Sequence, residues 1–581
     1  MTKDLIVKRV FVANLVGFVL LAGCSLPPTA GQSPGAPGQP DGAPVANQNQ
    51  TLTMAFRYEP VGLFAKLPGS GSSNDMKRFF NAALSLVDGA GTPRPYLAEA
   101  LPLLNTDSWR VHPDGRMETT YRLRPGLTWH DGKPLTADDF VFTFRVYSAS
   151  SLGIFVPKPQ DQIEEVVAVD PRTVLIRWRS IYPDAGAIQN KDLDPLPRHL
   201  LEGALTAVET NPADQDVFVN HPYWSNEFVS VGPYRMDAWI PGTQIEGSAF
   251  EGHALGRPKI DRILIRFLTD ENTVASNILA ESVHYTGRHS LFFEHATVLK
   301  RDWAANNRGA VILSTDTRAY NDFQFKPDYQ KTPTLLDVRV RRALAHSVDR
   351  QTLQDGLFDG EGELIYTFIS NRMPYYPDVD RSMATYPYDP RRSEQLMNEA
   401  GFTKDRGGFF ANAAGERFAP DYKGFTGTMF ERGHAIMTDT WRKAGFDMQT
   451  SIIQTAQLRD TELRHTFPGM SIAQTSGAES SQDLFTTAQA GTRANRWRGQ
   501  NRGGYSNPEF DRLWDAFSTT LDRKERDQQM VQMMRLISED LPAIVIYANF
   551  VVETHLTTLR GPELGTPDSL MYWNVQEWSF Q

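Results

Sequence analysis

Residues of the types used in covalent catalysis are present, but their spacing forms none of the familiar catalytic motifs. The nearest approach to the serine nucleophile elbow G-x-S-x-G is the run 469–473, which ends in Ala473 where the motif needs glycine. The sequence contains neither the H-E-x-x-H zinc motif nor a P-loop. We therefore expect no enzyme activity, no catalytic residue, no cofactor and no metal site.

Two groups of charged or titratable side chains could instead bind a ligand, and each has a simpler structural interpretation. His130 lies in the predicted turn 130–134, where a local hydrogen bond explains it better than ligand binding. Arg339, Arg341 and Arg342 could contact an anion, but a solvated helix face explains them more simply. Neither group is counted among the predicted ligand-binding residues.

The composition excludes one class of partner. The 581-residue chain has a formal net charge of -10 and a pI of about 5.7. No stretch is dense enough in lysine and arginine to follow a phosphate backbone, so we expect no nucleic-acid partner. Hydrophobic residues make up 40% and aromatic residues 11%, which is ordinary for a globular protein.

The single cysteine, Cys24, lies where a lipid anchor would be attached. Basic residues at positions 3, 8 and 9 precede an apolar stretch, 10–20, that is too short for a comfortable membrane span. The run 21–24, Leu-Ala-Gly-Cys, resembles the lipobox of bacterial lipoproteins, in which the signal peptide is cut before the cysteine and the thiol carries a diacylglycerol. We predict a signal peptide over 1–23; an ordinary signal peptide with an incidental cysteine is the alternative.

The segment 24–50 is predicted to be a disordered tether. It is rich in Pro, Gly, Gln and Ala, and it has no aromatic residue and one charge, Asp41. Such a tether spans roughly 28 Å on average. No later hydrophobic run is long enough to cross a bilayer. We expect a protein held by lipid in the periplasm or on the outer face of the cell membrane.

From residue 51 onward, alternating strand and helix patterns predict an α/β body. Residues 117, 119, 121 and 123 share one face of a predicted strand. Asn507 and Pro508 open a helix, and Asp522 opens another. Met530, Met533 and Met534 in that second helix could form an adaptable binding surface, but one face of a core helix is the favoured interpretation.

Several segments, in this order along the chain, resemble the family 5 extracellular solute-binding proteins, the oligopeptide- and dipeptide-binding class. They are Tyr-Leu-Ala-Glu-Ala at 96–100, the run 121–140 that contains His-Asp-Gly-Lys-Pro, Gly-Pro-Tyr at 232–234, 337–345 with 348–350, Tyr-Asp-Pro at 388–390, 399–402, Tyr-Ser-Asn-Pro at 505–508 and Trp-Asn at 573–574. One such match alone would be weak, whereas the ordered set covers the chain from about residue 51 to its end.

The resemblance implies a two-lobed periplasmic-binding-protein-like α/β fold of the hinge-bending class II, with an extra domain inserted in lobe I. We place lobe I at 51–92, 226–318 and 541–581, the additional domain at 93–225, and lobe II at 319–540. The implied mechanism is hinge closure around a solute, because the solute contacts both lobes only in the closed state. The implied partners are a peptide or other small polar solute and the permease and ATPase of an ABC importer, and we expect a monomer.

The resemblance also implies where a ligand would bind. In peptide-binding relatives a lobe II aspartate pairs with the α-ammonium group of the ligand, and Gly477 stands at that position here. Glu479 or Asp483 could substitute after a loop shift, but neither is in register. Arg464 falls near an arginine that some relatives direct toward the ligand carboxylate, and a surface arginine is equally compatible. Our predicted ligand-binding residues are Glu59, Pro60, Arg464, Thr475, Ser476, Gly477, Ala478 and Glu479.

Two alternatives stay open from the sequence. The same scaffold carries oligosaccharides and nickel chelates, so a solute other than a peptide is a rival ligand. A receptor that presents its closed form to a sensor, instead of to a transporter, has the same sequence pattern.

Overall fold

The computed structural model describes residues 50–64, 75–149, 152, 159–189, 192–454, 457 and 460–581. The chain divides into two units, 1–48 and 49–581, and every described residue belongs to the second. The predicted signal peptide, Cys24 and the tether up to residue 49 lie outside the described residues. Within the described ranges, no helix combines the length and the apolar character needed to cross a membrane.

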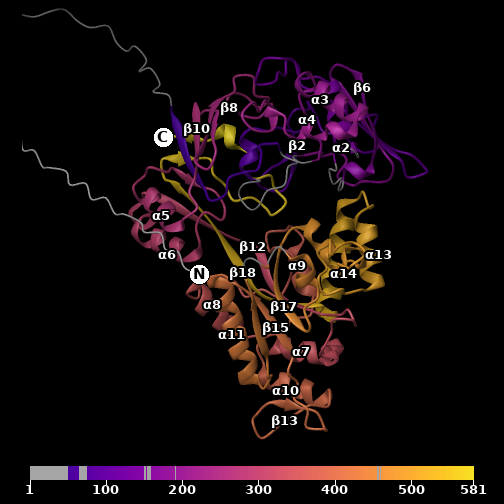
Figure 1. The fold of residues 1–581 in the computed structure, drawn as a ribbon, viewed down its shortest axis with the longest axis vertical. Coiled ribbons are helices and arrows are strands. Elements are labelled where there is room, and N and C mark those ends of the chain that lie inside the picture. Colours follow the sequence, from indigo (N-terminus) through magenta and orange to yellow (C-terminus); the bar gives the residue numbers. More distant parts are fainter. Residues whose placement is uncertain are drawn as a thin grey trace, which may run out of the picture. The chain divides into compact units, whose positions relative to one another are not determined.

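A ten-stranded mixed sheet runs through the described body, in the order β16-β15-β17-β12-β18-β11-β1-β10-β9-β8 (Figure 1). The strands are β1 (Thr51–Phe56), β8 (Tyr234–Ile240), β9 (Gln244–Ala249), β10 (Arg262–Phe267), β11 (Tyr285–Thr286), β12 (Gly309–Phe323), β15 (Asp421–Phe425), β16 (Gln449–Ile453), β17 (Met470–Ser476) and β18 (Ala543–Leu556). We call the part built on β1 and β8 to β11 lobe I, and the part built on β15 to β17 lobe II. The two-lobed α/β fold expected from the resemblance is therefore present.

Two long strands, β12 and β18, connect the lobes. Residues 309–314 of β12 pair with the end of β18 that also contacts β11. Residues 317–322 pair with both β18 and β17. The β12–β18 register shifts between Ser314 and Thr317, which marks an irregularity between these two regions. In Figure 1 the two strands lie between β10 of lobe I and β15 of lobe II.

A second, four-stranded sheet lies within the range 93–225, in the order β4-β5-β7-β6. Its strands are β4 (Trp109–Val111), β5 (Met117–Arg122), β6 (Ile163–Asp170) and β7 (Thr173–Trp178), accompanied by α2 (Ala137–Ser148), α3 (Arg198–Thr210) and α4 (Gln215–Val219). The pair β2 (Ser85–Val87) and β3 (Pro93–Pro95) precedes it. The residue boundaries that we assigned to the lobes and to the additional domain stay predictions.

The remaining helices follow the lobes along the chain. They are α5 (Glu271–Leu279) and α6 (Phe293–Asp302) next to lobe I, and α7 (Val338–His346), α8 (Arg350–Phe358), α9 (Tyr376–Ser382), α10 (Pro390–Glu399), α11 (Thr428–Ala444), α12 (Thr461–His465), α13 (Pro508–Phe517) and α14 (Arg523–Asp540) in lobe II. Small antiparallel pairs are β13 (Thr403–Lys404) with β14 (Phe410–Ala411) and β19 (Leu559–Arg560) with β20 (Ser579–Phe580).

The helix starts confirm the capping predictions. The side chain of Asn507 accepts hydrogen bonds from the backbone at the start of α13, and Asp522 does the same for α14. Met530, Met533 and Met534 are buried in one apolar cluster, so the core interpretation of the methionines is confirmed.

Two structural interpretations of the sequence need correction. His130 Nε2 lies 3.0 Å from the Gly232 carbonyl oxygen, and Nδ1 lies 3.3 Å from the Ser230 amide nitrogen, so its hydrogen bonds are not local but join segments 100 residues apart. Arg341 does not lie on a solvated face: it is buried and donates to the carbonyl groups of Leu335, Asp540 and Leu541. It thereby satisfies carbonyl groups that the end of α14 leaves unpaired.

Candidate functional site

The strand directions bring the carboxyl ends of both lobes to the same part of the molecule. In lobe I, β1 is parallel to β10 and β11, and in lobe II, β15 is parallel to β16 and β17. β18 is antiparallel to both β11 and β12, so β11 and β12 run in the same direction, from lobe I toward lobe II. β17 is antiparallel to β12, so the parallel strands of lobe II run toward lobe I. Ligands of open α/β sheets bind outside the carboxyl ends of the strands. The chain segments that follow β1, β11 and β17 are therefore the candidate site.

The segment after β17 contains both acidic residues that could substitute for the aspartate expected from the resemblance, Glu479 and Asp483. Glu479 starts a short 3-10 helix, 479–485, and its carboxylate is buried. Arg523, the first residue of α14, holds that carboxylate with both terminal nitrogens: Nη1 lies 3.2 Å from Oε2, and Nη2 contacts Oε1. Arg523 also forms an ion pair with Asp527 at 2.8 Å. The charge of Glu479 is therefore already balanced from within lobe II.

Asp568, from the C-terminal segment, lies beside Glu479. Burial raises the pKa of the Asp568 carboxyl group to about 7, and the neighbouring Glu479 carboxylate also raises it, whereas the Glu479 backbone amide and Arg523 lower it. The segment around Asp568 is attached to lobe I, because Thr566 N donates to Gly89 O at 3.1 Å and Leu570 N donates to Val87 O at 3.0 Å. The two acids thus meet from different lobes.

Two further contacts cross between parts of the body. Arg372, in lobe II, donates to the carbonyl of Gly565 in the same C-terminal segment and pairs with Asp316 on β12. Arg526 on α14 donates to Asp184 at 2.9 Å. The contacts involve guanidinium groups, which can keep charged hydrogen bonds in a partly solvated junction.

Gly477 has little room for a side chain. Its N–H donates to the Asp316 carbonyl at 2.6 Å, and its own carbonyl accepts from Ser370 N at 3.0 Å. A Cβ atom at this position would lie 2.9 Å from Ser370 N and 3.1 Å from Asp316 O. A side chain at 477 would therefore require the neighbouring backbone to move.

On lobe I, the segment after β1 places Glu59 and Pro60 near the strand end, but the carboxylate of Glu59 has structural partners. Trp239 Nε1 donates to it at 2.7 Å and Gly242 N at 3.0 Å, so it ties the β8–β9 turn to the end of β1. Pro60 is buried. Tyr58, between them and the strand, is exposed.

Arg464 lies away from these residues. It is in α12, which precedes the amino end of β17, whereas Glu479 follows the carboxyl end. Burial lowers the pKa of Arg464 to about 10, and the nearby positive charge of Arg502 lowers it further. Thr475 and Ser476 end β17 and Ala478 follows Gly477, so the structure brings the predicted residues 475–479 together and separates Arg464 from them.

Sequence reasoning missed a buried acid on the connecting strand. Glu553 of β18 accepts a hydrogen bond from Tyr285 Oη at the end of β11, and burial raises the pKa of its carboxyl group. The only indication of this residue in the sequence was a glutamate directly after the largely apolar run 543–552. The ion pair between Asp316 and Arg372 joins residues 56 positions apart, and nothing in the sequence indicated it.

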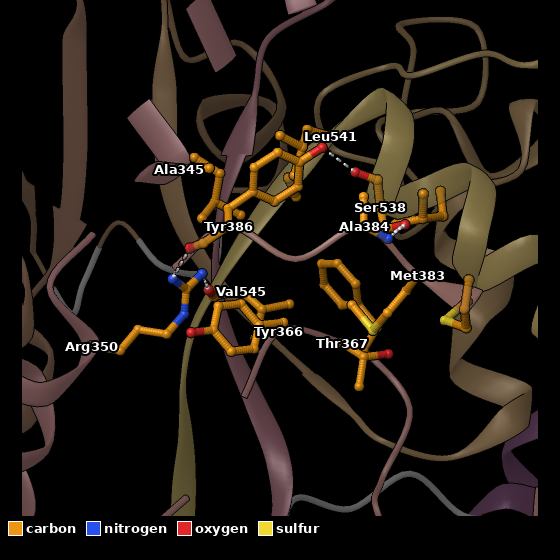
Figure 2. Close-up of a pocket in the computed structure, with 15 residues that line it drawn as sticks. Ala345, Arg350, Tyr366, Thr367, Met383, Ala384, Tyr386, Ser538, Leu541 and Val545 are labelled. Carbon is orange, nitrogen blue, oxygen red and sulfur yellow. Dashed lines mark hydrogen bonds between the residues drawn. The ribbon is translucent and has the colours of Figure 1, made fainter. Parts of the chain in front are cut away.

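Two cavities among the described residues lie away from this junction. One of about 20 Å³, enough for a single water, is internal to lobe II (Figure 2). Beside it, Arg350 donates to the carbonyl oxygens of Ile365, Tyr386 and Val545 at 3.0, 3.1 and 2.8 Å, so the arginine of the motif at 348–350 is structural. A polar depression of about 470 Å³ lies on lobe I and includes His130 and Arg235. Across the same described ranges, no group of three or more His, Cys, Asp or Glu side chains could hold a metal ion.

Comparison with known proteins gives consistent matches. The family model for bacterial extracellular solute-binding proteins, family 5 (middle region), matches residues 99–496. The oligopeptide-binding protein AppA of Bacillus subtilis is 24% identical over 509 residues, which cover 86% of each chain. The structure of AppA in complex with a nonapeptide aligns with a TM-score of 0.69 at 20% identity, covering 92% of this chain and 99% of AppA.

A nickel-related structure aligns equally well. NikZ of Campylobacter jejuni, in complex with Ni(L-His), has a TM-score of 0.70 at 19% identity and covers 92% of this chain and 100% of its own. At these identities the structural likeness establishes a shared fold.

Proposed function

This chain belongs to the bacterial extracellular solute-binding proteins of family 5, and we propose that it captures a peptide or a solute of similar size for an ABC importer. The observation that carries this proposal is the meeting of the carboxyl ends of two sets of parallel strands where β12 and β18 connect the lobes. The peptide complex of AppA, which has the same fold, supports the choice of ligand class.

The mechanism is closure of the two lobes over the solute. The register shift between Ser314 and Thr317 gives β12 a local irregularity at which the connection can bend. A solute that touches both strand-end segments stabilises the closed arrangement by its additional contacts, and the population shifts accordingly. The contacts of Arg372 with Gly565 and of Arg526 with Asp184 contribute to the same arrangement. This chain's task is to bind, enclose and present the solute, so no bond is made or broken.

The proposed ligand-facing segments are those that follow the strands. In lobe II they are residues 475–479, which offer the hydroxyl groups of Thr475 and Ser476. In lobe I the exposed Tyr58 precedes Glu59 and Pro60. Ligand binding by Arg464 stays a separate prediction, because this residue precedes the amino end of β17 and the other segments follow the carboxyl ends of strands.

Delivery requires the protein to stay near its importer. The proposed anchor is a diacylglycerol on Cys24 after removal of residues 1–23, with 24–50 as the tether. A chelated metal ion is the second candidate solute, favoured by the alignment with NikZ in its Ni(L-His) complex.

A thermal-shift panel of short peptides, oligosaccharides and nickel–histidine tests the proposal. A solute at about 100 times its Kd adds about 2.7 kcal/mol to the stability. For a body of about 530 residues this is a rise of about 2–3 °C in Tm. A rise with peptides supports the proposal. A rise only with nickel–histidine or sugars refutes the peptide ligand and keeps the solute-binding function.

A further inference from the structure

The electrostatic arrangement at the end of β17 has a consequence for the kind of solute that can bind there. Glu479 is the acidic side chain closest in sequence to this strand end, and only 7% of the residue is exposed. A carboxylate this deeply buried needs a cationic partner or several hydrogen-bond donors. A positively charged group of a solute would be one such partner.

Arg523 already supplies the partner from within the chain. Its two terminal nitrogens contact the two carboxylate oxygens of Glu479, while its Nε pairs with Asp527. The guanidinium lies 5.8 Å from the ring centre of Tyr375. The paired geometry uses the planar fork of arginine, which a solute ammonium group could not reproduce.

Arg523 nevertheless remains accessible from solvent, in contrast to the acid that it neutralises. Its side chain is 51% exposed, whereas the side chain of Glu479 is 9% exposed. Of the two paired side chains, the arginine is therefore the one that a solute or a solvent cation can reach more easily.

The surrounding charges show what Arg523 balances. The acids facing it are Glu479, Asp527 and, from the C-terminal segment, Asp568. The neighbouring Arg526 is engaged by Asp184, which also lies within electrostatic range of Asp568. Without Arg523, several carboxyl groups would share one guanidinium, and the site would attract a cation strongly.

We infer that Arg523 is a built-in counter-ion that fills the cationic position beside Glu479, so that the protein selects solutes presenting an uncharged group there. An acylated amino terminus or a hydroxyl-rich group has this chemistry, whereas a free ammonium group would have to displace the guanidinium. The solute selectivity rests on the proposed function. The counter-ion role of Arg523 can be tested without any peptide.

The direct test is chemical rescue of the purified full chain. Arg523→Ala should lower Tm, and millimolar methylguanidinium should restore much of the loss, more than equal ethylammonium or sodium chloride does. The double variant Glu479→Gln with Arg523→Ala should show no such rescue. Rescue that is absent, or equal in the double variant, overturns the inference. Arg535→Gln is the matched control, because Arg535 pairs with Glu539 on the same helix with its side chain 60% exposed.

The selectivity arm uses tetra-alanine and its N-acetylated form as probes. The protein should bind the N-acetylated form more tightly than the free amine, and Arg523→Gln, which keeps a hydrogen-bonding side chain, should reverse this preference and favour the free amine by about tenfold. A wild-type protein that loses about tenfold or more on acetylation overturns the inference and leaves peptide binding intact. If neither probe binds, the peptide proposal fails, and the rescue result alone decides whether Arg523 is the counter-ion.

Discussion

The pair Asp316–Arg372 offers a perturbation with two separable effects. The side chain of Asp316 is 8% exposed and that of Arg372 is 25% exposed. Asp316 accepts from Ser370 Oγ at 3.2 Å and from Arg372 Nε at 3.2 Å, while Arg372 Nη1 reaches the Gly565 carbonyl. Arg372→Met would leave a buried carboxylate with one hydroxyl partner and would remove a contact between the lobes.

The first effect is on the stability of the fold. Removing one partner of a buried ion pair costs about 3–5 kcal/mol. Because Arg372 is partly solvated and Ser370 remains, we expect about 2–3 kcal/mol, which corresponds to a fall of about 2–3 °C in Tm. The double variant Asp316→Asn with Arg372→Met should recover part of this loss, because the unpaired carboxylate is gone, although the buried Arg318 guanidinium loses the negative charge beside it.

The second effect is on solute affinity. The Arg372–Gly565 hydrogen bond links the lobes, and a charged hydrogen bond contributes about 1.5 kcal/mol or more, so its loss should raise Kd by about tenfold. The double variant should keep the weakened Kd although its stability recovers in part. Calorimetric titration and thermal unfolding of both variants measure the two quantities. A Kd that recovers together with Tm would refute the assignment of Arg372 to the junction between the lobes.

Three other predictions follow, two from the structure and one from the sequence. Gly477→Asp should lower Tm and create no ammonium-binding site, because the new Cβ atom would lie 2.9 Å from Ser370 N. Tighter binding of free-amine peptides by this variant would contradict the packing argument. Burial raises the pKa of Asp568, and also that of Asp322, to about 7, above the ordinary value of 3.8, so their contribution to stability is complete below about pH 4 and is lost as the pH rises through 7. The Tm of Asp568→Asn relative to wild type should therefore increase between pH 4.5 and 7.5, and a difference independent of pH would be inconsistent with the raised pKa. Cys24→Ser should move the protein from the membrane fraction to the soluble extracytoplasmic fraction, whereas unchanged membrane association would argue against lipid attachment.

The local elements could be predicted because their causes lie close together in the chain. Asn507 and Asp522 cap helices that begin one residue later, and the strand over 117–122 follows from alternation within six residues. The site could not be predicted in the same way. Glu479 and Arg523 are 44 residues apart, and the pair forms only because β17 and α14 are placed together by the fold.

Long-range packing explains why the predictions for His130 and Arg341 were wrong. The partners of His130 are 100 residues away, so a turn motif could not identify them. Gly477 N–H donates to the carbonyl of Asp316, a residue far away in the sequence, so no local sequence pattern could indicate this contact.

Small-angle X-ray scattering with and without a solute found in the thermal panel tests the central claim most directly. Closure of two lobes about β12 and β18 predicts that saturating solute lowers the radius of gyration, and that Arg372→Met needs about tenfold more solute for the same change. A solute that binds saturably and leaves the radius of gyration unchanged would contradict hinge closure as the binding mechanism.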